Sequence, residues 1–152
     1  MPYLKNVKID GFRTYRKCTD MEDFGKGVNL VVGMNGCGKT NLLNAILFVL
    51  SDTYVNLKDD EKNSLLFEGP SKAVQQASVD LIFDNSDKTM NSGCGDLNDT
   101  VSVKRMLTKK TTGKKTTYED KYFVDGKQKG RQEVKNFLAL SGMQVSNPYY
   151  VV

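Results

Sequence analysis

Hydrophobic and polar residues alternate along several stretches of the chain, a pattern typical of β-strands with one buried face. The alternation covers residues 3–10, 77–84, 101–105 and 118–124. The sequence TTGKK, residues 111–115, lies between the last two stretches and predicts the tip of a hairpin. Asp125-Gly126 then predicts a tight turn. Residues 11–27 are polar and punctuated by glycine, and there we expect turns with a short strand.

Other segments are apolar without this alternation. Val28–Val32 is short and rich in β-branched residues, which predicts a buried strand. Over residues 39–50 the apolar positions cover most of a helical surface, so we expect a helix buried against a sheet. Gln132–Ser141 has helical spacing and is followed by Gly142, a typical C-terminal cap. The final YYVV is apolar as well, and we expect the natural polypeptide to continue beyond it.

Composition excludes several kinds of chemistry. The 152 residues contain no histidine, which removes Ser-His-Asp triads, Cys-His pairs and His-ligated metals. The three cysteines, Cys18, Cys37 and Cys94, form no C-x-x-C pair, so a reducing interior such as cytosol or nucleus is favoured over a zinc or disulfide framework. No apolar run approaches the roughly 20 residues of a membrane span, and the start has no apolar secretory core. We expect no membrane partner.

Residues 33–41, GMNGCGKTN, fit the phosphate-loop pattern G-x-x-x-x-G-K-[ST]. Glycines let successive N–H groups turn into a concavity sized for phosphate, and the N-terminus of the following helix adds positive potential. In this pattern the lysine reaches the β- and γ-phosphates and the threonine hydroxyl coordinates Mg²⁺. The predicted nucleotide site consists of Gly33, Met34, Asn35, Gly36, Cys37, Gly38, Lys39, Thr40 and Asn41, with Thr40 as the metal ligand.

Cys37 allows two interpretations. A helix N-terminus lowers the pKa of a thiol, which would make the side chain reactive. Alternatively the position contributes only its backbone N–H, and any small side chain suffices there. We favour the second interpretation, which predicts that Cys37→Ser leaves ATP affinity within about twofold.

Hydrolysis also requires an acid to hold Mg²⁺, usually at the end of a buried apolar strand. Asp84 ends the stretch VDLIFD, but Asp80 interrupts the apolar run and Asn85 follows where a glutamate would be expected. The stretch alternates like a strand with one exposed face. We therefore interpret Asp84 as the end of a surface strand, and the chain contains no other candidate.

The charge is unevenly distributed. Residues 104–131 contain ten basic and three acidic residues, a net charge of +7 in a chain whose total is +4. A concentrated basic stripe favours contact with a polyanion. A solvated lysine-rich loop is the alternative.

Two segments, YLKNVKIDGFRTYR (residues 3–16) and VNLVVGMNGCGKTNLLNAILFVLSD (residues 28–52), resemble the N-terminal ATPase lobe of the structural maintenance of chromosomes (SMC) family. In that family the loop reads G-x-N-G-[small]-G-K-[ST]-N, which Asn35, Gly36 and Asn41 match. LLFEG, LIFDNSD and SNPYYVV are similar to the third SMC subunit of cohesin in particular. The loops at 91–100 and 111–119 fit least well.

The resemblance implies an α/β fold, half of an ABC-type P-loop NTPase domain, with a mixed sheet around the P-loop helix and an antiparallel β-subdomain. Residues 1–152 would form the N-terminal lobe of an SMC head, ending before the Q-loop, the coiled coil and the C-terminal lobe. In the family that C-terminal lobe supplies the magnesium Asp, the catalytic Glu and a signature motif. The resemblance thus implies an ATPase that is complete only with the C-terminal lobe and a partner head.

The implied cofactors are ATP and Mg²⁺. The implied partners are the chain's own C-terminal lobe, a second SMC head, a kleisin, and DNA bound without sequence preference. A cohesin-type subunit would act in sister-chromatid cohesion and DNA entrapment, on chromosomes in the nucleus. A condensin-type subunit or a coiled-coil ATPase of double-strand-break repair is the alternative. A self-contained phosphate-loop kinase or GTPase is disfavoured, because either needs an Asp on a buried strand and a GTPase also needs an Asn-Lys-x-Asp guanine reader, which the sequence lacks.

The resemblance also assigns residues outside the loop. Arg13 and Thr14 match a position that contacts the nucleotide; for Arg13 a surface residue after the first strand is the less favoured alternative. Lys58 stands where the family has an arginine at the head interface, and it lacks the planar fork of arginine. The family places DNA contact and acetylation at a lysine pair. Lys109-Lys110 is the closest match to that pair, and Lys114-Lys115 is a rival because this loop is longer.

Overall fold

The computed structural model describes residues 2–36, 38–69, 74–91 and 98–143. Its elements are β1 (Tyr3–Asp10), β2 (Thr19–Asp20), α1 (Lys39–Leu50), the 3₁₀ turn η1 (Asp52–Tyr54), α2 (Asp59–Asn63), β3 (Gln76–Asp84), β4 (Thr100–Thr112), β5 (Lys115–Val124), β6 (Lys127–Lys129) and α3 (Arg131–Leu140). The alternating stretches, the short strand in residues 11–27 and both long helices are thus confirmed. None of the helices among these residues is long and apolar enough to cross a membrane.

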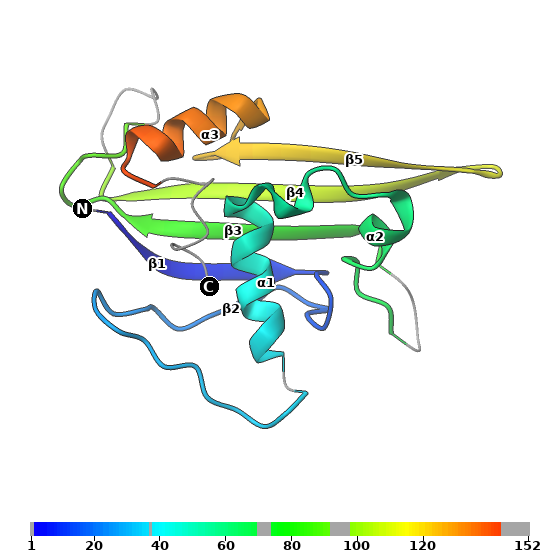
Figure 1. Ribbon diagram of the computed structural model, residues 1–152, viewed down its shortest axis with the longest axis horizontal. Coiled ribbons are helices and arrows are strands. Elements are labelled where there is room, and N and C mark those ends of the chain that lie inside the picture. The colour runs from blue at the N-terminus through cyan, green and yellow to red at the C-terminus, as the bar shows by residue number, and fades with distance from the viewer. Residues whose placement is uncertain (1, 37, 70–73, 92–97, 144–152) are drawn as a thin grey trace.

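The strands form one six-stranded sheet in the order β2-β1-β3-β4-β5-β6 (Figure 1). β1, β3, β4 and β5 each pair antiparallel with the next strand, and the β4–β5 hairpin extends to one end of the molecule's long axis. The α/β class and an antiparallel sheet bearing the basic hairpin are therefore confirmed. The mixed sheet is not seen in the described part of the chain, where every strand pair is antiparallel.

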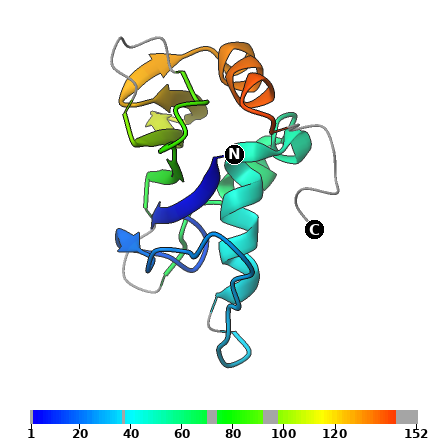
Figure 2. The same cartoon turned by 90° about the vertical axis from the view of Figure 1, so that its left-hand side faces the viewer.

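The helices pack on one face of the sheet, as Figure 2 shows for α1 and α3. The alternation of the strands explains this arrangement, because the buried positions of β3 and β4 all point to the same face. That face meets Leu42, Ala45 and Phe48 of α1 in a single core. The core fixes α1, and with it the phosphate loop, against the central strands.

The segment Val28–Val32 differs from its prediction. It forms no strand, and the side chains of Val28, Leu30 and Val32 are 102%, 84% and 76% exposed. A fully buried strand needs paired neighbours on both edges and packing on both faces. The described sheet provides neither beside these residues. The edge of β1 is already paired with β2, and β2 is the last strand on that side of the sheet.

Candidate nucleotide-binding site

The phosphate loop leads directly into α1, which begins at Lys39. Gly38 caps the helix with a left-handed backbone, φ 97°, and Gly36 is left-handed as well, φ 82°. Non-glycine residues rarely adopt this conformation. Gly36 and Gly38 of the loop therefore make the turn that directs the chain into the helix. Cys37 lies outside the described residues, so both interpretations of its thiol remain predictions.

A cavity of about 240 Å³ opens at this turn. It is lined by Thr14, Asn35, Gly36, Gly38, Lys39, Thr40 and Asn41. The structure thus brings together most of the predicted loop residues with Thr14, which is distant in sequence. No aspartate or glutamate lines this cavity in the described part of the chain.

Lys39 folds back over the loop. Its ammonium donates hydrogen bonds to the carbonyl oxygen of Gly33 and, at 2.9 Å, to that of Met34. Lys39 lines the cavity, which also adjoins the start of α1, where the first N–H groups have no acceptor within the helix. The combination favours an anion in the cavity.

The turn after β1 brings two neighbouring residues to different places. Thr14 lines the cavity, and its hydroxyl accepts a hydrogen bond from the amide of Asn41 at 3.1 Å. Arg13 is not among the lining residues, and its guanidinium lies 5.9 Å from the ring centre of Phe12. The buried Nε of Arg13 has no hydrogen-bond partner among the described residues. The structure therefore associates Thr14, but not Arg13, with the cavity wall.

Asp84 lies far from the phosphate loop. It pairs with Tyr3 at the beginning of β1, whereas Thr14 follows the end of that strand. The eight-residue strand that lies between these two points is roughly 25 Å long. Hydrogen bonds from the hydroxyl and N–H of Ser86 lower the pKa of Asp84. These contacts agree with its interpretation as the end of a surface strand.

Lys58 precedes α2 and is exposed. Its backbone N–H donates to the carboxylate of Glu61 at 2.7 Å, and this hydrogen bond caps the helix. The Lys58 side chain takes no part in that bond. The helix packs against β5 at the base of the basic hairpin. Lys58 and the hairpin lysines therefore share one end of the molecule.

The two rival lysine pairs of the hairpin have different surroundings. Lys109 is half-buried, and its ammonium donates to Asn63 of α2 at 2.7 Å. Lys110 forms an ion pair with Glu119 across the hairpin. Lys114 and Lys115 are exposed at the tip, where they follow the left-handed Gly113. Lys109 is thus engaged in the fold, Lys110 is exposed but paired with Glu119, and the tip presents Lys114 and Lys115 to solvent.

Arg105 does not belong to the basic surface to which the sequence assigned it. It is only 2% exposed and pairs with Asp120, while its other N–H groups donate to the carbonyl oxygens of Phe48 (2.7 Å) and Tyr54 (2.8 Å). Its guanidinium also stacks 4.3 Å from the ring centre of Phe48. The strand alternation places this arginine on the core face, where it fastens β4 to the end of α1.

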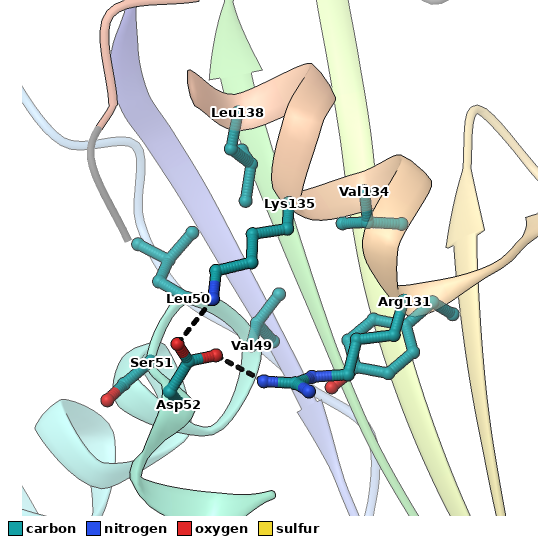
Figure 3. A pocket seen from close by; sticks show the side chains of 9 residues that line it. Val49, Leu50, Ser51, Asp52, Arg131, Val134, Lys135 and Leu138 are labelled. Carbon is teal, nitrogen blue, oxygen red and sulfur yellow. Dashed lines mark hydrogen bonds and ion pairs between the residues drawn. The ribbon is translucent and has the colours of Figure 1, made fainter. Parts of the chain in front are cut away.

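Arg131 is also engaged within the fold. Asp52, which follows α1, receives ion pairs from Arg131 and Lys135 of α3 (Figure 3). The hydrogen bond from Lys135, together with the two positive charges, lowers the pKa of Asp52. The basic stripe is therefore smaller than its composition indicated, and its solvent-facing part is concentrated in the hairpin.

One residue of the site was missed by sequence reasoning. The hydroxyl of Tyr15 donates to the carbonyl oxygen of Gly38 at 3.1 Å. Tyr15 lies in a polar turn, and no spacing or periodicity connects it with a loop 23 residues later. Only its position beside Arg13 and Thr14 in GFRTY could have drawn attention to it.

Comparisons with known proteins agree with this geometry. Structural maintenance of chromosomes protein 3 is 41% identical in Arabidopsis thaliana and 40% identical in Caenorhabditis elegans, over 99% and 98% of this chain. The chain spans only 12% and 11% of those two relatives. The crystal structure of the Smc head domain from Pyrococcus furiosus, with an extended coiled coil and the C-terminal domain of ScpA bound, superposes with a TM-score of 0.74 at 26% identity. That likeness covers 95% of this chain and 34% of the other.

The model of the RecF/RecN/SMC N-terminal domain matches residues 3–147, almost the whole chain. The matched residues include the phosphate loop, α1 and the complete antiparallel sheet. Sequence match, fold and loop geometry all lead to the same assignment, so the chain belongs to the RecF/RecN/SMC N-terminal domain family.

Proposed function

We propose that this chain is the ATP-binding N-terminal half of an SMC ATPase head of cohesin type. The observation that carries the proposal is the cavity at the start of α1, where the left-handed Gly38, the ammonium of Lys39 and free helix N–H groups converge. These groups suit the phosphates of ATP. The chain is about 40% identical to structural maintenance of chromosomes protein 3 of two organisms. This identity favours the cohesin-type role over a condensin-type or repair ATPase.

Mg²⁺ would be held only in part by this chain. Thr40 lines the cavity and offers one hydroxyl oxygen, a hard ligand of the kind that Mg²⁺ prefers. The described residues add no carboxylate there, so phosphate oxygens and another polypeptide segment would complete the coordination. Lys39 would stabilise the negative charge of the transferred phosphoryl group.

The missing carboxylates would come from the chain's own C-terminal lobe. Two observations on this structure support such a partner: the exposed apolar segment Val28–Val32, and a groove of about 290 Å³ beside it. The groove is lined by Phe24 on one side and by Leu43 of α1, which is 48% exposed, on the other. Burial of these side chains by a second lobe would remove apolar surface from water.

Further partners follow from the family. A second SMC head would close the nucleotide site, and a kleisin would bind the assembled head; the ScpA-bound relative supports the latter. The assembly would act on DNA in the nucleus, in sister-chromatid cohesion. Lys58, exposed next to the hairpin, would contribute a positive charge at the head interface.

DNA would contact the tip of the hairpin. Lys114 and Lys115 are exposed there, whereas Lys109 and Lys110 already have partners in the fold. We therefore prefer the tip pair for both phosphate contact and acetylation. Replacing Lys114 and Lys115 by glutamine should weaken DNA binding and lower its salt dependence by up to about two phosphate contacts. Lys127→Gln/Lys129→Gln is the matched control, and an equal effect of both double variants would contradict the preference.

The central experiment measures ATP binding and hydrolysis by the full-length protein with its partner head. Lys39→Ala should abolish both, because it removes the charge that faces the phosphates. The isolated 152-residue segment should bind ATP weakly and hydrolyse it negligibly, and the added C-terminal lobe should restore turnover. A turnover of about 1 s⁻¹ by the segment alone, within the range of ordinary enzymes, would refute the half-site proposal.

A further inference from the structure

The carbonyl oxygen of Gly38 accepts two hydrogen bonds. The N–H of Leu42 donates to it at 3.0 Å as the first hydrogen bond of α1, and the hydroxyl of Tyr15 donates at 3.1 Å. A carbonyl oxygen has two lone pairs, so this acceptor is fully used. Its direction is therefore determined from two sides, by the helix and by the turn after β1.

The same peptide unit carries a donor of the phosphate site. The bond between Gly38 and Lys39 is a trans peptide, and its planarity makes the Lys39 N–H point opposite to the Gly38 carbonyl. Lys39 is the first residue of α1, so its N–H has no acceptor within the helix. Whatever orients the Gly38 carbonyl therefore also orients a free N–H group beside the cavity.

Tyr15 is itself held by the core. Its backbone N–H donates to the carbonyl oxygen of Phe12 at 2.9 Å, and Phe12 is fully buried. Phe12 also forms a β-bridge with Leu66, and the ring of Tyr15 packs against the core. The hydroxyl thus reaches the loop from a fixed platform, and little side-chain freedom is lost when it bonds to Gly38.

The approach of the turn to the loop is close. A Cβ atom on Gly38 would lie 3.0 Å from the hydroxyl oxygen of Thr14 and 3.3 Å from that of Tyr15. The bond from Asn41 to Thr14 joins the same turn to the first helical turn of α1. Side-chain hydrogen bonds from Asn41 to Thr14 and from Tyr15 to Gly38 therefore connect the turn after β1 with the start of the helix, and the Tyr15 bond reaches the Gly38–Lys39 peptide itself.

We propose that Tyr15 is a positioning residue of the phosphate site. Its hydroxyl sets the orientation of the Gly38–Lys39 peptide, and thereby directs the Lys39 N–H toward the β-phosphate of the nucleotide. This inference rests on the nucleotide site proposed above. Because ADP and ATP both carry a β-phosphate, loss of the hydroxyl should weaken the binding of both by the same factor.

The test is Tyr15→Phe in the full-length protein. Calorimetry measures the equilibrium binding of ATP and of ADP, and thermal unfolding of the same variant measures its stability. The loss of one orienting hydrogen bond should weaken both nucleotides about two- to tenfold. Tyr54→Phe is the matched control, because the Tyr54 hydroxyl also bonds to α1, at Asn44 (3.3 Å), but outside the cavity lining. The control should bind both nucleotides as the unmodified protein does.

Lys39→Ala separates the failure of this inference from the failure of the proposed function. If Lys39→Ala retains full nucleotide affinity, the phosphate site is wrong and the role of Tyr15 falls with it. If Lys39→Ala loses binding while Tyr15→Phe binds normally, the site stands and the inference is overturned. An equal loss in Tyr15→Phe and Tyr54→Phe would also overturn it, since a general loosening of α1 would then explain the effect.

Discussion

Arg105→Ala should destabilise the head far more than any substitution of an exposed lysine. The guanidinium is 2% exposed and donates to Asp120 and to the carbonyl oxygens of Phe48 and Tyr54. Removing it leaves both carbonyls without this donor and the carboxylate without its ion-pair partner. Each unsatisfied buried carbonyl costs about 1–3 kcal/mol, and truncation of a buried ion pair typically costs about 3–5 kcal/mol in total.

The lower part of that range is expected here. The side chain of Asp120 is 33% exposed, so water partly solvates its orphaned charge. A loss of about 3 kcal/mol corresponds to a more than hundredfold rise in the opening equilibrium of the affected elements. The rise should concentrate where Arg105 makes its contacts: the end of α1, η1, β4 and β5.

Hydrogen exchange of the full-length protein, followed peptide by peptide, measures this effect locally. Lys104→Ala is the matched control, because Lys104 is the preceding residue on β4 and points to the uncovered face of the sheet. Its effect should stay below about 0.5 kcal/mol. If exchange in α1 and β5 accelerates equally in both variants, Arg105 does not fasten these elements together.

Three further outcomes follow from the structure. Gly38→Ala should weaken ATP binding at least tenfold in a calorimetric titration, because φ 97° strains any side chain and the added Cβ would press on the turn after β1. Gly36 is also left-handed, at φ 82°, but it has open space around it, so Gly36→Ala should lose less ATP affinity. The pKa of Asp52 is lowered from 3.8, chiefly by the hydrogen bond from Lys135, so its ion pairs contribute stability above pH 3.8 that is lost as the pH falls through the lower folded value. The protection of the α3 amides against hydrogen exchange, taken relative to the intrinsic exchange rate at each pH, should therefore fall below about pH 4, and Asp52→Asn should abolish that fall. Leu30→Asp should leave the 152-residue lobe folded, because the Leu30 side chain is 84% exposed, but it should reduce co-purification with the C-terminal lobe. Unchanged co-purification would contradict the docking of that lobe on Val28–Val32.

The local elements could be predicted because their signals are local. Strands with one apolar face alternate regardless of what covers them, and β1, β3 and β4 lie where alternation placed them. The phosphate loop is specified by the glycines and the lysine within nine residues, and α1 begins at the residue that the motif predicts.

The contacts that make a site could not be predicted in this way. The bond from Tyr15 to the loop joins residues 23 apart, the Lys109–Asn63 bond joins residues 46 apart, and the Arg105–Phe48 bond joins residues 57 apart. A basic residue in a charged stretch looks the same in the sequence whether it is solvated at a hairpin tip or buried in the core. Side-chain roles therefore depended on which surfaces folding brought together.

The sequence by itself determined the family of the chain, the phosphate loop with its helix, and the strands of the sheet, because each depends on neighbours in the chain. The tertiary structure decided three other matters: that Arg105 is internal, that Tyr15 supports the loop, and that Val28–Val32 is exposed. The last case shows the physical reason. An apolar run states that burial is favourable, but whether burial occurs depends on a partner surface in space, and the described part of the chain does not supply one for these residues.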